Sequence, residues 1–175
     1  MKIEFLSDLA DAPSQSTVTF DGCETPGAVS LRGTGFAARD WQLRALATEV
    51  DGRAVTADVR VASLPAHLPA KTHAAYGRGA AKDWYDIAYV VLHNDGGGPD
   101  GAAARVWTVF RSDLMGQTRR ALGELAANFV EASAQGTLAF AKTMTELHPD
   151  LDADVLANDA VAGMAAFLRG PGFDP

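Results

Sequence analysis

The sequence predicts an α+β fold in which a small, mostly antiparallel or mixed sheet at the N-terminus precedes a bundle of about five helices. Strict alternation of polar and apolar residues marks strands before residue 62, and helical periodicity takes over after residue 63. Of the 175 residues, 47% are hydrophobic and 21% are charged, which is typical of a folded globular protein. The shift in pattern divides the chain into a strand-rich part, residues 1–62, and a helical part, residues 63–175.

The strands are predicted from short alternating runs that end at turn residues. Three short candidates cover residues 3–6, 16–20 and 28–31. Residues 41–50 fit either a strand or a short helix, and Asp51-Gly52 then forms a turn before the clearest strand, residues 54–61. In that strand Val55, Ala57, Val59 and Val61 share one face, which we expect to pack against the helices while Thr56, Asp58 and Arg60 point to the other side.

The helices are predicted from 3.6-residue periodicity between capping and breaking residues. Ser63 is a suitable N-cap for the first helix, which ends at the glycines around residue 78. The expected helices cover residues 63–78, 80–92, 102–110, 116–144 with a break near 136, and 153–168. Trp84 and Ile87 should be buried, and Trp41 and Trp107 should pack in the core or between helices.

Charge and cysteine content exclude several classes of protein. The formal net charge is −7, and no basic block forms the footprint of a nucleic-acid-binding protein. Cys23 is the only cysteine, so an intramolecular disulfide and a cysteine-based metal site are excluded, and a small core residue is the expected role. No apolar run reaches the roughly 20 residues of a membrane span, and no signal peptide is evident, so we expect a cytoplasmic protein.

One segment, residues 63–87, brings charged residues together at the junction of two helices. Lys71 and Arg78 are seven residues apart and therefore project from nearly the same side of one helix. Asp83 lies in the first turn of the next helix, and Asp86 lies one turn later. Lysine, arginine and a carboxylate at one point suit the binding of a phosphate group. The alternative is a structural ion pair between Arg78 and Asp83, with Lys71 solvated.

The same segment resembles the last motif of the AbiEii-type nucleotidyltransferases, toxin-like enzymes of the DNA polymerase β superfold. The matching run is Ala70-Lys71-x-x-Ala74-x-x-x-Arg78-x-x-x-Lys82-Asp83-x-Tyr85-Asp86-Ile87. The resemblance implies part of a nucleotidyltransferase-like fold and a catalytic contribution to the nucleotide site from Lys71 and Asp83. It implies binding roles for Arg78, Lys82 and Asp86, with Arg78 and Asp86 bracing the two helices.

Enzymes of this family hold Mg²⁺ and a nucleoside triphosphate through a Gly-Ser turn and an Asp-x-Asp pair that lie upstream of this motif, together with a further carboxylate. The chain contains no Gly-Ser dipeptide. Residues 2–6 resemble the strand that bears the further carboxylate, which makes Glu4 the candidate metal ligand and a third catalytic residue. Asp150, Asp152 and Asp154 are expected to cap a helix rather than to bind metal. Asp8 and Asp11, in a predicted loop, are weak candidates for the missing metal ligands.

We therefore expect a truncated or degenerate nucleotidyltransferase that transfers a nucleotidyl group to RNA or protein only if the metal-binding segment is supplied. The alternative function is non-enzymatic binding of a nucleotide or a partner. The free edge of the N-terminal strand should be covered by a homodimer, by a partner subunit, or by a local segment such as residues 16–20 or 28–31.

Overall fold

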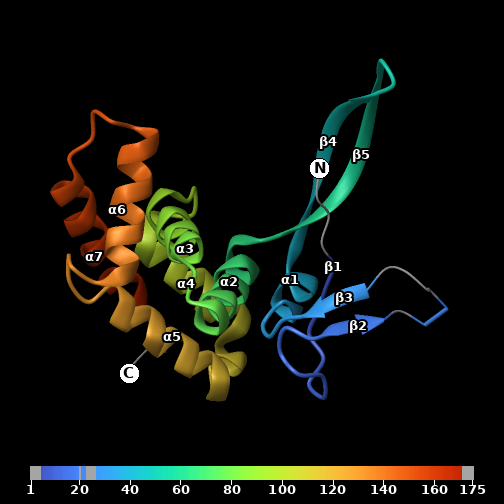
Figure 1. Cartoon of the computed structure of the whole chain (residues 1–175), viewed down its shortest axis with the longest axis horizontal. Helices are drawn as coiled ribbons and strands as arrows, with labels where there is room; N and C mark the ends of the chain where they lie inside the picture. Colours follow the sequence, from blue (N-terminus) through green and yellow to red (C-terminus); the bar gives the residue numbers. More distant parts are fainter. Residues whose placement is uncertain (1–4, 20, 23–26, 171–175) are drawn as a thin grey trace.

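The computed structural model describes residues 5–19, 21–22 and 27–170, so Glu4 and Cys23 lie outside the described residues. The fold is α+β, as predicted, with the strands gathered on one side and a helical bundle on the other (Figure 1). The strands are β1 (Phe5–Ser7), β2 (Thr17–Thr19), β3 (Gly27–Ser30), β4 (Trp41–Val50) and β5 (Arg53–Ala62). The helices are α1 (Gly35–Arg39), α2 (Leu64–Arg78), α3 (Ala81–His93), α4 (Gly98–Phe110), α5 (Gly116–Asn128), α6 (Gln135–Leu147) and α7 (Ala153–Leu168).

The N-terminal sheet is mixed and has the strand order β1-β3-β2. β1 runs parallel to β3, with Leu6 opposite Val29, and β2 runs antiparallel to β3. The segment expected to cover an edge of the N-terminal strand, residues 28–31, therefore pairs one edge of β1. No strand among the described residues pairs the other edge.

β4 and β5 form a separate two-stranded ribbon joined by a two-residue turn. Asp51 and Gly52 both have positive φ angles, 50° and 75°, as a hairpin turn of this length requires. The predicted hairpin is confirmed, and the ambiguous segment 41–50 is a strand.

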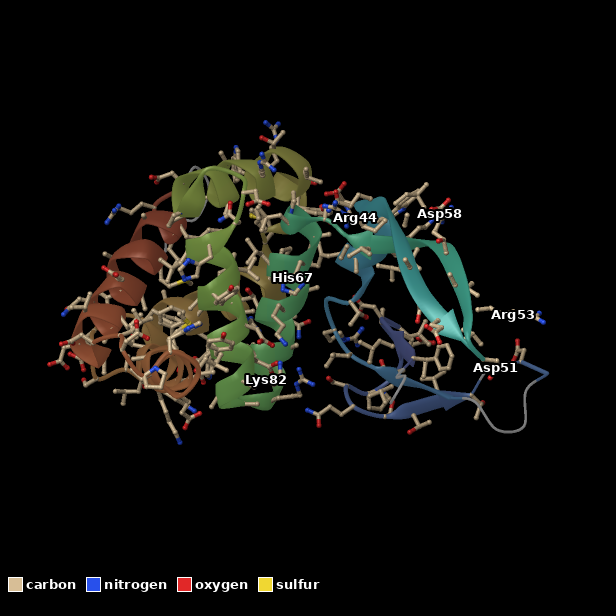
Figure 2. The ribbon with its side chains drawn as sticks, turned by 90° about the horizontal axis from the view of Figure 1, so that it is seen from above. Arg44, Asp51, Arg53, Asp58, His67 and Lys82 are labelled. Carbon is tan, nitrogen blue, oxygen red and sulfur yellow. The ribbon has the colours of Figure 1, made fainter. Side chains whose placement is uncertain are left out.

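The expectation that one face of this hairpin packs against the helices is wrong. The ribbon projects away from the bundle (Figure 1), and Asp51 and Arg53, labelled in Figure 2, lie at its far end. Val55, Val59 and Val61 keep 42%, 39% and 40% of their surface exposed, and Ala57 is also exposed. Alternation identifies residues that share one face of a strand, but it carries no information on whether another element covers that face.

Trp41, expected in the core, lies at the base of the ribbon and is 38% exposed. The Arg60 guanidinium lies 4.1 Å from its ring centroid, in a cation–π contact across the two strands. The indole therefore packs under a charged side chain of the ribbon rather than between helices.

Capping residues account for both ends of α2 and for the start of α7, where the Asp152 carboxylate accepts from the Asp154 and Val155 amides. The Ser63 hydroxyl accepts a hydrogen bond from the Ala66 amide at 3.3 Å, and Gly79 ends α2 with a left-handed φ of 61°. α4 begins at Gly98 rather than near 102, because a proline in its first turn follows the left-handed Gly97. The break expected near Gly136 occurs just before it, between α5 and α6. None of the described helices has the length and hydropathy that crossing a membrane requires.

The main core lies inside the bundle formed by α2 to α7. Trp84 and Ile87 are 2% and 0% exposed, as predicted. Other large side chains that are fully buried include Val91, Val106, Phe110, Leu125, Phe140, Met164 and Phe167. Phe36 from α1 joins this core and meets Phe110 edge-to-face with 5.0 Å between ring centroids. The strand-rich part is thus fastened to the bundle by packing as well as by the chain.

Close packing between α5 and α6 yields a test of the fold with two glycines. A Cβ at Gly136 would lie 2.7 Å from the Asn128 carbonyl oxygen and 2.6 Å from the Phe129 ring, whereas a Cβ at Gly123 meets nothing within 4 Å. We expect Gly136→Ala to lower the free energy of unfolding by about 1–3 kcal/mol through overpacking. Gly123→Ala, the matched control, should raise it by about 0.5–1 kcal/mol. Urea unfolding measures both, and equal effects of the two variants would contradict the described packing.

Candidate functional site

A groove of about 670 Å³ lies between α2 on one side and β1, the loop after β3 and α1 on the other. Ala62, the last residue of β5, also lines it. The polar residues on its walls are Ser7, Asp8, Thr34, His67, Lys71 and Arg78. Both predicted cations of the motif, Lys71 and Arg78, therefore face a cavity that can receive a ligand.

One face of α2 supplies its side of the groove. His67, Lys71, Ala74 and Arg78 follow one another at intervals of four, three and four residues, which is the spacing of one helical face. Small residues on that face, such as Ala74, leave the two cations accessible between them.

Lys71 is held by two carboxylates of the next helix. Its Nζ lies 2.8 Å from Asp83 Oδ1 and 2.8 Å from Asp86 Oδ2, and its side chain is 19% exposed. Burial disfavours the lysine charge, but hydrogen bonds to the two carboxylates outweigh it and raise the pKa of Lys71. The ammonium is therefore charged at neutral pH, and the alternative in which Lys71 is merely solvated does not hold.

Asp83 lies behind the groove and binds both cations. Arg78 donates to it from Nε at 3.1 Å and from Nη2 at 2.9 Å, in a bidentate pair. Asp83 is only 3% exposed and is absent from the groove walls. The expected convergence of Lys71, Arg78 and Asp83 is thus found, with the carboxylate placed to orient the cations rather than to touch a ligand in the groove.

Asp86 and Lys82 form the outer part of the cluster. The Lys82 ammonium lies 2.8 Å from Asp86 Oδ2, and its side chain is 79% exposed. Burial disfavours the charge of Asp86, but hydrogen bonds from Lys71 and Lys82 outweigh it and lower the pKa of this carboxyl. Lys82 and Asp86 do not line the groove, so they reach it only through Lys71.

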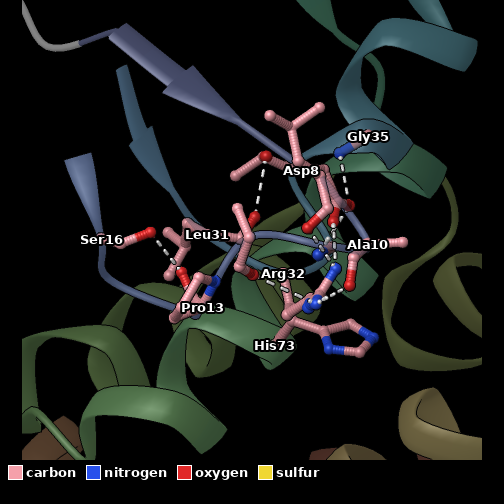
Figure 3. A network of polar contacts seen from close by, with 12 residues as sticks. Asp8, Ala10, Pro13, Ser16, Leu31, Arg32, Gly35 and His73 are labelled. Atoms are coloured by element: carbon pink, nitrogen blue, oxygen red, sulfur yellow. Dashed lines mark hydrogen bonds and ion pairs between the residues drawn. The ribbon is translucent and has the colours of Figure 1, made fainter. Parts of the chain in front are cut away.

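Asp8 also lines the groove, although it lies outside the sequence motif that identified Lys71 and Arg78. Its Oδ2 accepts hydrogen bonds from the Gly33 amide at 2.9 Å and the Gly35 amide at 3.1 Å (Figure 3). It is the only carboxylate among the described residues that line the groove. Its position directly after the first strand was the available signal, since residues that follow strands commonly carry function.

The described residues do not form a metal site by themselves. No group of three or more His, Cys, Asp or Glu side chains among them is arranged to hold an ion. Glu4, the predicted metal ligand, lies outside the described residues, and Asp8 alone cannot replace an Asp-x-Asp pair. The donor set of this part of the chain therefore fits phosphate binding and does not fit a complete Mg²⁺ cage.

His67, which is half-buried in the groove wall, and His73, which is buried on the same helix, are held in the neutral form. Burial, reinforced by the charge of Lys71, lowers the pKa of His67. Burial also lowers the pKa of His73, which is 6% exposed and lies with Nε2 3.0 Å from Thr118 Oγ1. Both side chains are therefore imidazoles near neutral pH.

Removal of the Asp83 charge should destabilise the fold strongly. Asp83→Asn leaves Lys71 and Arg78 without their shared buried carboxylate, and loss of one partner of a buried ion pair typically costs about 3–5 kcal/mol. We expect the free energy of unfolding, measured with urea, to fall by that amount. Asp159→Asn, at an exposed position of α7, should change stability by no more than about 0.5 kcal/mol. An Asp83→Asn variant as stable as this control would refute the bracing role.

The lowered pKa values of His67 and His73 predict that the protein loses stability in mild acid. Their folded pKa values lie below the ordinary 6.5, so the unfolded chain binds protons first as the pH falls. The stabilisation is complete above about pH 6.5 and is lost as the pH falls through the folded pKa values. Urea unfolding between pH 7.5 and 5 should show this slope, and His73→Gln should flatten it. His148→Gln, at an exposed position, is the control, and an unchanged slope in His73→Gln would contradict the prediction.

Comparison with known families supports the sequence resemblance. The family model described as "Nucleotidyl transferase AbiEii toxin, Type IV TA system" matches residues 29–166. The chain matches no curated protein and no solved structure. The matched region contains β4, β5, the whole of α2 and α3, and both cations of the groove. Because the match spans well over half of the 175 residues, the chain belongs to the AbiEii nucleotidyltransferase toxin family.

Proposed function

We propose that this chain supplies the phosphate-binding part of a nucleotidyltransferase site, with the triphosphate of a nucleotide bound between Lys71 and Arg78. The observation that carries the proposal is that both cations line the groove while the carboxylate that orients them is buried behind it. A phosphate in the groove therefore meets positive donors on the α2 side.

Hydrogen-bonding capacity supports this assignment. A lysine ammonium has three donors, and the two carboxylates of α3 use two of them, so one remains for a phosphate oxygen. Arg78 uses Nε and Nη2 on Asp83, which leaves Nη1 available on a side chain that is 44% exposed. Both cations can bind a ligand without giving up their contacts with Asp83.

The charge balance of the cluster also supports the binding of a phosphate-containing ligand. Three cations, Lys71, Arg78 and Lys82, face two carboxylates, Asp83 and Asp86, so the cluster keeps one positive charge. That surplus lies on a protein whose formal net charge is −7. A local positive site on an acidic protein favours a small anionic ligand over a long polyanion.

In this mechanism Asp83 and Asp86 are positioning residues. They hold the Lys71 ammonium charged and aimed before a nucleotide arrives, which avoids reorganisation when phosphate charge develops. Transfer of the nucleotidyl group to RNA or protein would require Mg²⁺, as in the family generally, and carboxylates beyond those that the structure describes. Glu4 remains a proposed ligand for that ion.

A toxin–antitoxin system pairs a toxin with an antitoxin, so family membership implies an antitoxin partner. The competing function is nucleotide binding without transfer, for which the two cations of the groove suffice and no metal ligand is required. Label transfer from each of the four nucleoside triphosphates to RNA and to protein, with and without Mg²⁺, distinguishes the two.

Lys71→Ala should weaken triphosphate binding by about tenfold or more, because a charge-assisted contact to phosphate is lost. Lys142→Ala is the matched control, since Lys142 is also paired with a carboxylate but is 78% exposed on α6. Calorimetric titration with ATP, GTP, CTP and UTP measures both variants. Equal affinities of Lys71→Ala and Lys142→Ala for the triphosphates would contradict the proposed phosphate site, provided that circular dichroism shows both proteins folded.

A further inference from the structure

We infer that Asp8 binds the ribose hydroxyls of the nucleotide and makes the groove selective for ribonucleotides. The inference rests on the proposed function, because it assigns the end of the ligand that lies away from the phosphates. Asp8 lines the same groove as Lys71 and Arg78 but belongs to the opposite side, formed by β1 and α1.

The Asp8 carboxylate is fixed by the backbone. Its Oδ2 accepts from the Gly33 amide at 2.9 Å and from the Gly35 amide at 3.1 Å. A Cβ at Gly35 would lie 3.1 Å from that oxygen, so glycine permits the close approach. A carboxylate held by two amides remains in place without help from a ligand, as a preformed recognition group requires.

The second oxygen of Asp8 keeps its hydrogen-bonding capacity. Arg32 Nη1 forms a long ion pair with Oδ1 at 3.9 Å, a separation beyond hydrogen-bonding distance. The Arg32 guanidinium instead donates to the carbonyl oxygens of Leu9 and Ala10 at 2.7 Å each (Figure 3). The Asp8 side chain is 27% exposed and lines both the groove and a second hollow beside Arg32, and we assign Oδ1 as the atom that accepts from a ligand in the groove.

Electrostatics decides which part of a nucleotide faces Asp8. A carboxylate repels phosphate, so the phosphates bind on the α2 side, near Lys71 and Arg78. The part next to Asp8 must be neutral and must donate hydrogen bonds. The wall also contains apolar surface, including Leu31, Ala38 and Ala70, against which a sugar or base packs.

A ribose offers the donors that fit this acceptor. Its 2′ and 3′ hydroxyls are adjacent O–H groups, and one carboxylate oxygen has two lone pairs to receive them. A carboxylate that binds ribose hydroxyls is also the usual solution in dinucleotide-binding folds, where it selects the unphosphorylated sugar. Amino and ring N–H groups of the base are the other neutral donors of a nucleotide, and because they differ between the bases they give a different pattern of selectivity.

The test compares the affinities of matched ligands by calorimetry in the presence of Mg²⁺. Each of the four ribonucleoside triphosphates is compared with its 2′,3′-dideoxy counterpart on the wild-type chain, on Asp8→Asn and on Asp11→Asn. Asp11 lies in the same loop, is exposed and does not line the groove, so it is the matched control. Asp8→Asn keeps an oxygen for the two backbone amides while it removes the charge.

We expect the wild-type chain and Asp11→Asn to bind ribonucleotides at least about tenfold more tightly than the dideoxy forms, for every base. In Asp8→Asn the ratio should fall towards one, with little change in affinity for the dideoxy ligands. No ribose preference in the wild-type chain would overturn the inference even if Asp8→Asn failed to fold. A preference that follows the base, or an equal loss for both sugars in Asp8→Asn, would also overturn it. Absence of any nucleotide binding would overturn the proposed function as well, so the two failures are distinguishable.

Discussion

The buried carboxylate of Asp83 is the contact on which the site depends. It binds Lys71 and Arg78 of α2 from the first turn of α3, at 2.8 Å and 2.9 Å through the same oxygen. Trp84, the next residue, is 2% exposed and anchors α3 in the core, so Asp83 cannot withdraw from the two cations without disturbing that packing. A charge this deeply buried is tolerated only when it is fully paired, which makes the cation positions part of the fold itself.

The other side of the groove is tied to the same core by α1. Asp8 binds the amides of Gly33 and Gly35, and α1 then places Phe36 against Phe110 of the bundle. Arg39 closes the connection with a bidentate pair to Asp113 at 2.7 Å and 2.9 Å. The two walls of the groove are therefore positioned by one core, although the residues that form them are far apart in the sequence.

The parts of this arrangement that depend on local spacing could be predicted from the sequence. Lys71, Arg78 and Asp83 lie within thirteen consecutive positions, and helical geometry with one glycine-rich turn brings them together. Asp8 could not be found in this way, because the amides that hold it, those of Gly33 and Gly35, are 25 and 27 residues away in the sequence. No periodic pattern of residues predicts that these segments meet. The alternation of residues 55 to 61 identified a strand correctly and its environment wrongly, because burial depends on elements that the pattern does not contain.

The exposed ribbon is nevertheless joined to the site at its base. Asp40 precedes β4, Ser63 follows β5, and the Ser63 amide donates to the Asp40 carbonyl at 3.1 Å, while the Ser63 hydroxyl contacts the Asp40 carboxylate. Ser63 is also the N-cap of α2, the helix that presents Lys71 to the groove two turns later. Because Ala62 of β5 lines the groove itself, the base of the ribbon and the helix that carries Lys71 and Arg78 form one continuous wall. A lone hairpin has little stability of its own, so this junction, rather than the strands beyond it, fixes the direction in which the ribbon leaves the protein.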